Sequence, residues 1–172
     1  MKLLILLALV GTVLGCDTWP NGTDTTFNWW VSCGTKVIYY DAYPTDSNNN
    51  PEYPIHLGQP VLAHANITNL GNVYKNLKIT LKIYSWGGWS GCDWHELPTF
   101  GLLDNLDACQ NGVPCPVPTG NQILVITLDF SKFQAIINLL TDDAPYQIWF
   151  QLSDVDSGDQ TCLTVQARAR IH

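Results

Sequence analysis

Cysteines are the residues of this sequence whose chemistry is easiest to infer. There are six of them, and an even number in an exported chain is typical of disulfides. The spacing Cys109-x5-Cys115 encloses a small loop, Asn111-Gly112-Val113-Pro114, which supports one bridge directly. Zinc binding is the alternative, but no two cysteines have the spacing C-x2-C and no two histidines the spacing H-x3-H. We therefore expect disulfides and no metal site.

Two other segments resemble catalytic or metal-binding motifs, and each lacks a required residue. His95-Glu96 begins like the zinc-protease motif H-E-x-x-H, but position 99 is threonine. The segment Asp154–Asp159 begins like a calcium loop, but its twelfth position is Val165, where such a loop needs glutamate. The sequence also lacks the Gly-x-Ser-x-Gly motif of hydrolases. We therefore expect a protein that is not an enzyme and has no cofactor, with residues 154–159 forming a solvated turn.

The N-terminus has the form of a secretory signal peptide. A positively charged start precedes an apolar run from Leu3 to Val10, which is too short to span a bilayer. Val13 and Gly15 then fit the small-residue rule for cleavage. We expect residues 1–15 to be removed and residues 16–172 to form one domain, either secreted or in the lysosomal lumen.

The sequence is acidic, with 15 Asp and Glu against 8 Lys and Arg and a formal net charge of −7. This charge argues against a nucleic-acid partner and against electrostatic docking on anionic membranes. Two glycosylation sequons, at Asn21 and Asn66, agree with export. We expect a glycosylated monomer.

Alternation of apolar and polar residues dominates the mature chain and predicts an all-β domain. It is clearest at 77–83, 146–152 and 163–171, and weaker at 36–43, 60–68 and 121–130. Turn residues separate these segments, and several short antiparallel strands with turns between them indicate a β-sandwich. One short helix is expected near 131–140, because Ser131 and Gln134 have capping-box spacing ahead of an apolar stripe.

Small residues on the inward faces of these strands leave a volume that must be filled. If Asn66 bears a glycan it faces outward, so Ala63 and Ala65 face inward, and alternation puts Ala167 and Ala169 inward in the last strand. Two sheets pack about 10 Å apart at high density, and an empty cavity costs about 24 cal/mol per Å3. Either large side chains of the facing sheet or a bound ligand fills the space, and the residues alone leave both alternatives open.

The segment after residue 84 is rich in aromatic residues and glycine. Trp86, Trp89 and Trp94 lie among four glycines, a composition that regular strand or helix does not favour. The segment is either a hydrophobic flap packed on the core and fixed by Cys92, or a rim around a cavity mouth, where indole rings contact both lipid and water. The sequence leaves both interpretations open.

Several motifs occur in a specific order along residues 31–171. They are Cys33-Gly34, the strand with Asn66-Ile67-Thr68, Cys109-x5-Cys115-Pro116, Ile148-Trp149-Phe150-Gln151-Leu152-x-Asp154, and Cys162 before an alternating last strand. In this order they resemble the ML lipid-recognition family, which includes the Niemann–Pick type C sterol-transfer protein, the group 2 mite allergens and the Toll-receptor lipid co-receptor. The resemblance implies an immunoglobulin-like β-sandwich whose two sheets part to hold a lipid in an internal cavity.

The resemblance also implies the disulfides Cys33–Cys162 and Cys109–Cys115, and elimination then pairs Cys16 with Cys92. Two features depart from the family. Its small N-terminal disulfide loop is absent, and the aromatic segment at 84–108 is longer than in the sterol carrier. A ganglioside-type glycolipid or a phospholipid is therefore as good a candidate ligand as a sterol.

Together these observations predict a lipid carrier that holds a sterol, glycolipid or phospholipid between its sheets and has a membrane or a receptor protein as a further partner. The expected lining residues are Ala65, Ile79, Leu81, Ile83, Ile148, Phe150, Val165 and Ala167, with Trp86, Trp89 and Trp94 at the rim. The alternative is a secreted receptor-interaction or immune-recognition protein of the same fold, with a filled core and no transferred ligand.

Overall fold

The computed structural model describes residues 15–88 and 91–171. All six cysteines and both sequons lie within these ranges. The signal peptide expected from the sequence lies outside them except for Gly15, and so does Trp89.

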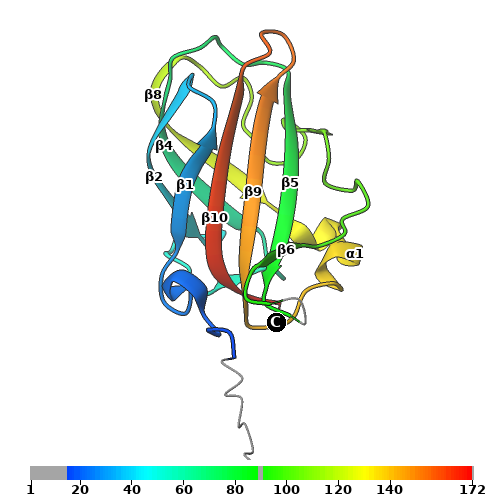
Figure 1. Ribbon diagram of the computed structural model, residues 1–172. Helices are drawn as coiled ribbons and strands as arrows, with labels where there is room; N and C mark the ends of the chain where they lie inside the picture. Colours follow the sequence, from blue (N-terminus) through cyan, green and yellow to red (C-terminus); the bar gives the residue numbers. More distant parts are fainter. Residues whose placement is uncertain (1–14, 89–90, 172) are drawn as a thin grey trace, which may run out of the picture.

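Two β-sheets pack face to face, and nearly all of the regular structure is strand (Figure 1). The larger sheet has seven strands: β1 (Asn28–Cys33), β10 (Gln160–Arg170), β9 (Ala144–Asp154), β5 (Leu77–Trp86) and β6 (Trp94–Glu96) in this order, with β3 (Ile55–His56) beside β10 and β7 (Leu106–Asp107) beside β5. The smaller sheet has the order β2 (Val37–Thr45), β4 (Val61–Asn69) and β8 (Gly120–Leu128). The described strands pair antiparallel except β3 with β10. The fold is the all-β, immunoglobulin-like sandwich that the sequence predicts.

The three segments with clear alternation are the strands β5, β9 and β10, and the three with weaker alternation are β2, β4 and β8. The short strands β3, β6 and β7 and the edge strand β1 were not expected. β1 contains the consecutive apolar residues Trp29-Trp30-Val31, so it lacks the alternation that marks a half-buried strand. A short 3₁₀ turn, η1 (Pro20–Gly22), precedes it.

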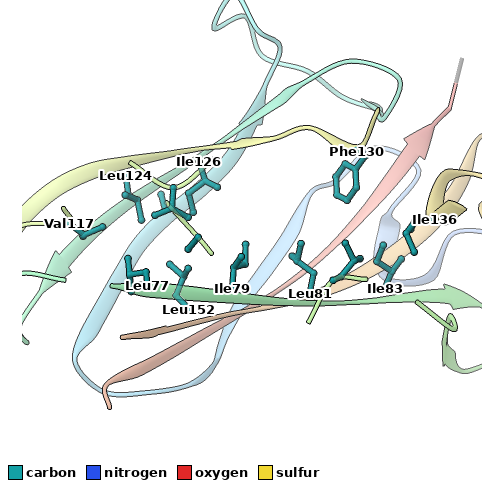
Figure 2. Packing of buried hydrophobic residues seen from close by; sticks show 14 of the residues in the cluster. Leu77, Ile79, Leu81, Ile83, Val117, Leu124, Ile126, Phe130, Ile136 and Leu152 are labelled. Atoms are coloured by element: carbon teal, nitrogen blue, oxygen red, sulfur yellow. The ribbon is translucent and has the colours of Figure 1, made fainter. Parts of the chain in front are cut away.

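The inward face of β5 forms the centre of the core. Leu77, Ile79, Leu81 and Ile83 lie on one side of the strand and point toward Leu124, Ile126 and Phe130 (Figure 2). Each of the four β5 residues is at most 6% exposed. Because successive strand residues point to opposite faces, the even-numbered residues of β5 lie on the outer face.

Three disulfides staple the domain, and they join the pairs that were expected: Cys16–Cys92, Cys33–Cys162 and Cys109–Cys115. The second joins the neighbouring strands β1 and β10, and the third closes a loop between β7 and β8. The first ties the N-terminal segment to the residues before β6. All six cysteines are described, and no bridge joins a strand of one sheet to a strand of the other.

A short helix lies where one was expected, between β8 and β9, but it is shorter and capped differently. A 3₁₀ turn, η2 (Phe130–Lys132), precedes a four-residue helix, α1 (Gln134–Ile137). Asp129 is the N-cap and accepts from the Ser131 backbone N–H, while the Gln134 side chain donates to the Ser131 carbonyl, so the predicted capping box does not form. Phe133 has non-helical φ and ψ and separates the two pieces. No helix in the described part of the chain is long and apolar enough to cross a membrane.

Candidate functional site

Four spaces in the described part of the chain concern us, and the largest of them lies between the two sheets, where small residues face large ones. Ala42 and Pro44 of β2 and Ala63 and Ala65 of β4 form one wall. The opposite wall consists of larger residues of the other sheet: Ile148 and Phe150 of β9, and Leu163 and Val165 of β10. The volume of this space is about 100 Å3. We call it the main cavity.

The burial of the larger wall is unusual for side chains that face another sheet. Ile148 pairs in register with Val165 and Phe150 with Leu163, and all four belong to the inward faces of β9 and β10. All four are nevertheless only half-buried, whereas Ile79 on β5 is 1% exposed. An inward side chain keeps accessible surface only if the gap beside it admits water-sized molecules. The main cavity is therefore a gap in the packing of the core.

The size of the main cavity determines what it can hold without rearrangement. An engineered apolar cavity of about 150 Å3 in another protein stays dry and binds benzene or xenon. A space of about 100 Å3 thus takes a small apolar group, and leaving it empty costs about 2 kcal/mol at about 24 cal/mol per Å3. A whole sterol or acyl lipid requires the sheets to move apart.

Smaller spaces adjoin the main cavity and extend it along the sandwich. One of about 30 Å3 shares Ile148 and Val165 with it, and one of about 20 Å3, near the β9–β10 turn, shares Tyr39 and Leu124. A third, also about 30 Å3, shares Leu81. The main cavity therefore shares wall residues with each of the three smaller spaces.

The structure brings most of the predicted lining residues together. Five of them border the main cavity: Ala65, Leu81, Ile148, Phe150 and Val165. Ile83 and Ala167 border the neighbouring space of about 30 Å3 that shares Ile148, and Ile79 borders the one that shares Leu81.

Trp86 and Trp94, the two predicted rim tryptophans within the described residues, lie away from these spaces. Trp86 occupies an even position of β5 and so points to the outer face, where its ring lies 5.2 Å from that of Trp94 across the β5–β6 hairpin. Its Nε1 donates to the Asp17 carbonyl at 2.7 Å, next to the Cys16–Cys92 bridge. Neither Trp86 nor Trp94 borders any of the four spaces. This is a flap fixed by Cys92 against the N-terminal segment, and the alternation of β5 was the signal that could have placed Trp86 outside.

Sequence reasoning missed several residues of the cavity wall. Tyr39 and Ala42 both face inward although they are three positions apart, because β2 has a bulge between Tyr39 and Asp41 that shifts its alternation. Phe27 and Leu57 lie outside any strand with alternation. No periodic signal could have found these last two.

Polar groups are sparse around the main cavity. The His64 Nε2 atom lies 3.0 Å from Thr45 Oγ1, and its ring stacks on Tyr43 at 4.9 Å. The Tyr39 hydroxyl accepts a hydrogen bond from Thr161 Oγ1 at 3.3 Å, and burial raises the pKa of Tyr39. Apart from His64 and the two tyrosine hydroxyls, the described residues that line the cavity are apolar. Such a wall suits the binding of an apolar molecule.

The two sequon asparagines are both exposed. Asn66 lies on the outer face of β4, between Asp41 of β2 and Ile123 of β8, which agrees with the inward position of Ala65. The Asn21 side chain donates from Nδ2 to Gln166 Oε1 at 2.8 Å.

Comparison with known proteins adds little to this geometry. No protein-family model matches the sequence, and no curated protein matches it. A solved Niemann–Pick type C2 protein from the Japanese carpenter ant is similar in structure, with a TM-score of 0.48 and 13% identity, over 83% of this chain and 99% of that one. The C-terminal domain of wzt is similar with a TM-score of 0.40 and 9% identity, over 91% of this chain and 87% of that one. Both TM-scores are below 0.5, so neither likeness establishes a family or a function for this chain.

Proposed function

We propose that this protein is a non-catalytic carrier that binds a lipid between its two sheets. The observation that carries the proposal is the main cavity, whose larger wall consists of inward side chains that remain half-buried. An apolar ligand placed there would cover Ile148, Phe150, Leu163 and Val165, each buried Å2 of apolar surface contributing about 25 cal/mol. The ordering costs of association reduce that gain.

Binding of a whole lipid requires the sheets to separate, and the covalent structure permits it. None of the bridges Cys33–Cys162, Cys16–Cys92 and Cys109–Cys115 joins a strand of one sheet to a strand of the other. In the described part of the chain, loops, side-chain packing and the hydrogen bond from Thr161 to Tyr39 connect the sheets. On the cavity side that packing includes four small residues of β2 and β4. Less contact area is therefore lost when the sheets part on this side.

The setting of the proposed carrier follows from the sequence. Removal of residues 1–15 and glycosylation at Asn21 and Asn66 would place it outside the cell or in the lysosomal lumen, where three disulfides persist. The candidate ligands are a sterol, a glycolipid or a phospholipid. A membrane or a receptor protein would supply or receive the ligand.

Native mass spectrometry of the protein secreted from eukaryotic cells tests this proposal. We expect a bound mass that is lost on organic extraction and is recovered in the lipid fraction. A ligand-free mass, together with no uptake of a fluorescent sterol or fatty acid, would contradict carriage and favour a receptor-interaction protein with the same fold.

A further inference from the structure

The end of the intersheet space beside the β9–β10 turn carries a carboxylate that points inward. Asp154 is the last residue of β9, and its alternation with Leu152 directs its side chain toward the other sheet. It pairs in register with Leu77 of the core and is only 3% exposed. Asp154 therefore brings a carboxylate into an apolar interior, at the end of the sandwich away from the C-terminus (Figure 1).

One oxygen of this carboxylate accepts hydrogen bonds within the turn, and the other accepts none. Oδ2 accepts hydrogen bonds from the Ser157 backbone N–H at 2.9 Å and from the Ser157 hydroxyl at 2.8 Å. Oδ1 is shielded from solvent and has no hydrogen-bond partner. Buried polar atoms are nearly always paired, and leaving a charged oxygen unpaired is costly. Oδ1 is thus an acceptor to which the described chain brings no donor.

Asp154 lines the small space of about 20 Å3 that adjoins the main cavity. Tyr39 and Leu124 border both spaces. On β5, Leu81 borders the main cavity and Leu77 the small space, and four residues of strand span about 13 Å. An aliphatic chain lying lengthwise between separated sheets can cover that distance. Its end group would then reach Asp154 from within the intersheet space.

The charges at this end argue against an anionic end group. Asp159 Oδ2 already accepts a hydrogen bond from the Tyr74 hydroxyl at 3.0 Å. Among the described residues that line the small space there is no Lys, Arg or His. A carboxylate or phosphate would meet two acidic side chains without a counter-charge, whereas a hydroxyl can donate to one of them.

From this geometry we infer, resting on the proposed lipid carriage, that the ligand is an apolar molecule with a terminal hydroxyl group and that Asp154 Oδ1 accepts the hydrogen bond from this hydroxyl. The site is distinct from the main cavity, which takes the apolar body of the same ligand.

The test compares two ligands with the same aliphatic chain, dodecan-1-ol and dodecanoate. Each displaces the fluorescent apolar probe N-phenyl-1-naphthylamine from the secreted, disulfide-bonded protein.

The variant Asp154→Asn keeps one oxygen that can accept hydrogen bonds from Ser157, and it replaces the unpaired acceptor Oδ1 by an NH2 donor. We expect this variant to bind dodecan-1-ol about tenfold more weakly or worse, and to bind dodecanoate at least as tightly as the parent does. Asp156→Asn is the matched control, because it removes the same charge from an exposed position of the same turn and should change neither affinity.

The outcomes separate this inference from the proposed function. If neither ligand nor the probe binds the parent protein, lipid carriage itself is wrong. If Asp154→Asn weakens both ligands equally or neither, carriage stands, but Asp154 does not recognise the hydroxyl and Oδ1 is paired by a water molecule only. If the variant does not fold, the parent protein alone still tests the inference. It should bind dodecan-1-ol about tenfold more tightly than the methyl ether of dodecan-1-ol, which lacks the hydroxyl donor. Equal affinities of the alcohol and the ether would overturn the inference.

Discussion

The two halves of the intersheet space contain similar inward residues with different burial. In the packed half, where β5 faces β8, Leu77, Ile79, Leu81 and Ile83 are at most 6% exposed (Figure 2). In the hollow half, where β9 and β10 face β2 and β4, the inward residues Ile148, Phe150, Leu163 and Val165 are only half-buried. Both sets consist of large apolar residues. Their own size therefore does not explain why one set is buried and the other is only half-buried.

The opposite wall explains the difference. Leu124 and Ile126 of β8 and Phe130 of η2 cover the packed half, and the same three residues also border one side of the main cavity. Alanines and a proline of β2 and β4 face the hollow half. Packed sheets generally lie about 10 Å apart, so small residues on one wall leave volume that the other wall does not fill. The position of a cavity is thus set by the small residues across from it.

Loss of the Cys33–Cys162 bridge should have the largest effect, because it joins β1 to β10 in the hollow half, where side-chain packing is weakest. The bridge closes a loop with a sequence separation of 129. The chain-entropy account gives about 5 kcal/mol for such a loop and about 2 kcal/mol for the short Cys109–Cys115 loop. Urea unfolding of the Cys33→Ser/Cys162→Ser double variant, with Cys109→Ser/Cys115→Ser as control, measures both. A smaller loss for the first pair than for the second would contradict this ranking.

Truncation of one isoleucine in each half tests the comparison directly. Ile79→Ala in the packed half should lower the free energy of unfolding by about 2–5 kcal/mol, as for buried aliphatic residues. Ile148→Ala makes the same chemical change in the hollow half and should cost clearly less, because its side chain already borders a gap. Chemical unfolding of the two variants side by side gives the difference. Equal losses would mean that the hollow half is packed as tightly as the other.

Most of the fold follows from local periodicity in the sequence. A strand such as β5 alternates buried residues with partly exposed ones, and the matching alternation of apolar and polar residues can be recognised without tertiary information. The edge strand β1 lacks that alternation, since Trp29, Trp30 and Val31 are consecutive. The N-cap at Asp129 could not be predicted either, because Ser131 offered an equally good capping pattern two residues later.

The cavity could be predicted in part. Alternation places Ala63 and Ala65 inward in β4, and this points to a gap opposite them. Tyr39 and Ala42 are hidden by the bulge in β2, because a bulge reverses the alternation from which inward positions are inferred. The Asp154 side chain looks like part of an ordinary acidic turn until the register with Leu77 places it inside.

Adding a phenyl group should give opposite results at two alanines of the hollow half that are both 6% exposed. Ala65→Phe adds its ring to the main cavity, so we expect little change in Tm and loss of fluorescent-lipid uptake. Ala167→Phe adds the same ring to a space of about 30 Å3, where overpacking should cost about 1–3 kcal/mol. Thermal melting and lipid uptake of both variants are the measurements. A large loss of Tm in Ala65→Phe, with no lipid uptake by the parent, would mean that the hollow half is a filled core.

The smallest effect should come from the ion pairs that fasten the hollow half at the start of β9. Asp143 accepts hydrogen bonds from Arg168 at 2.6 Å and from Arg170 at 3.1 Å, both on β10, and these partners hold the pKa of Asp143 well below its usual range. A carboxylate with a lowered pKa in the folded state stabilises that state above the unfolded pKa of about 4, and this contribution is lost as the pH falls toward the folded pKa. Asp143→Asn should therefore lower Tm slightly at pH 7, by an amount that shrinks as the pH falls below about 4.

The control for this prediction is Asp156→Asn, at an exposed position, for which we expect no such pH-dependent difference in Tm. Melting curves between neutral and acid pH decide, and a Tm difference for Asp143→Asn that grows on acidification would show that these ion pairs do not fasten β9 to β10.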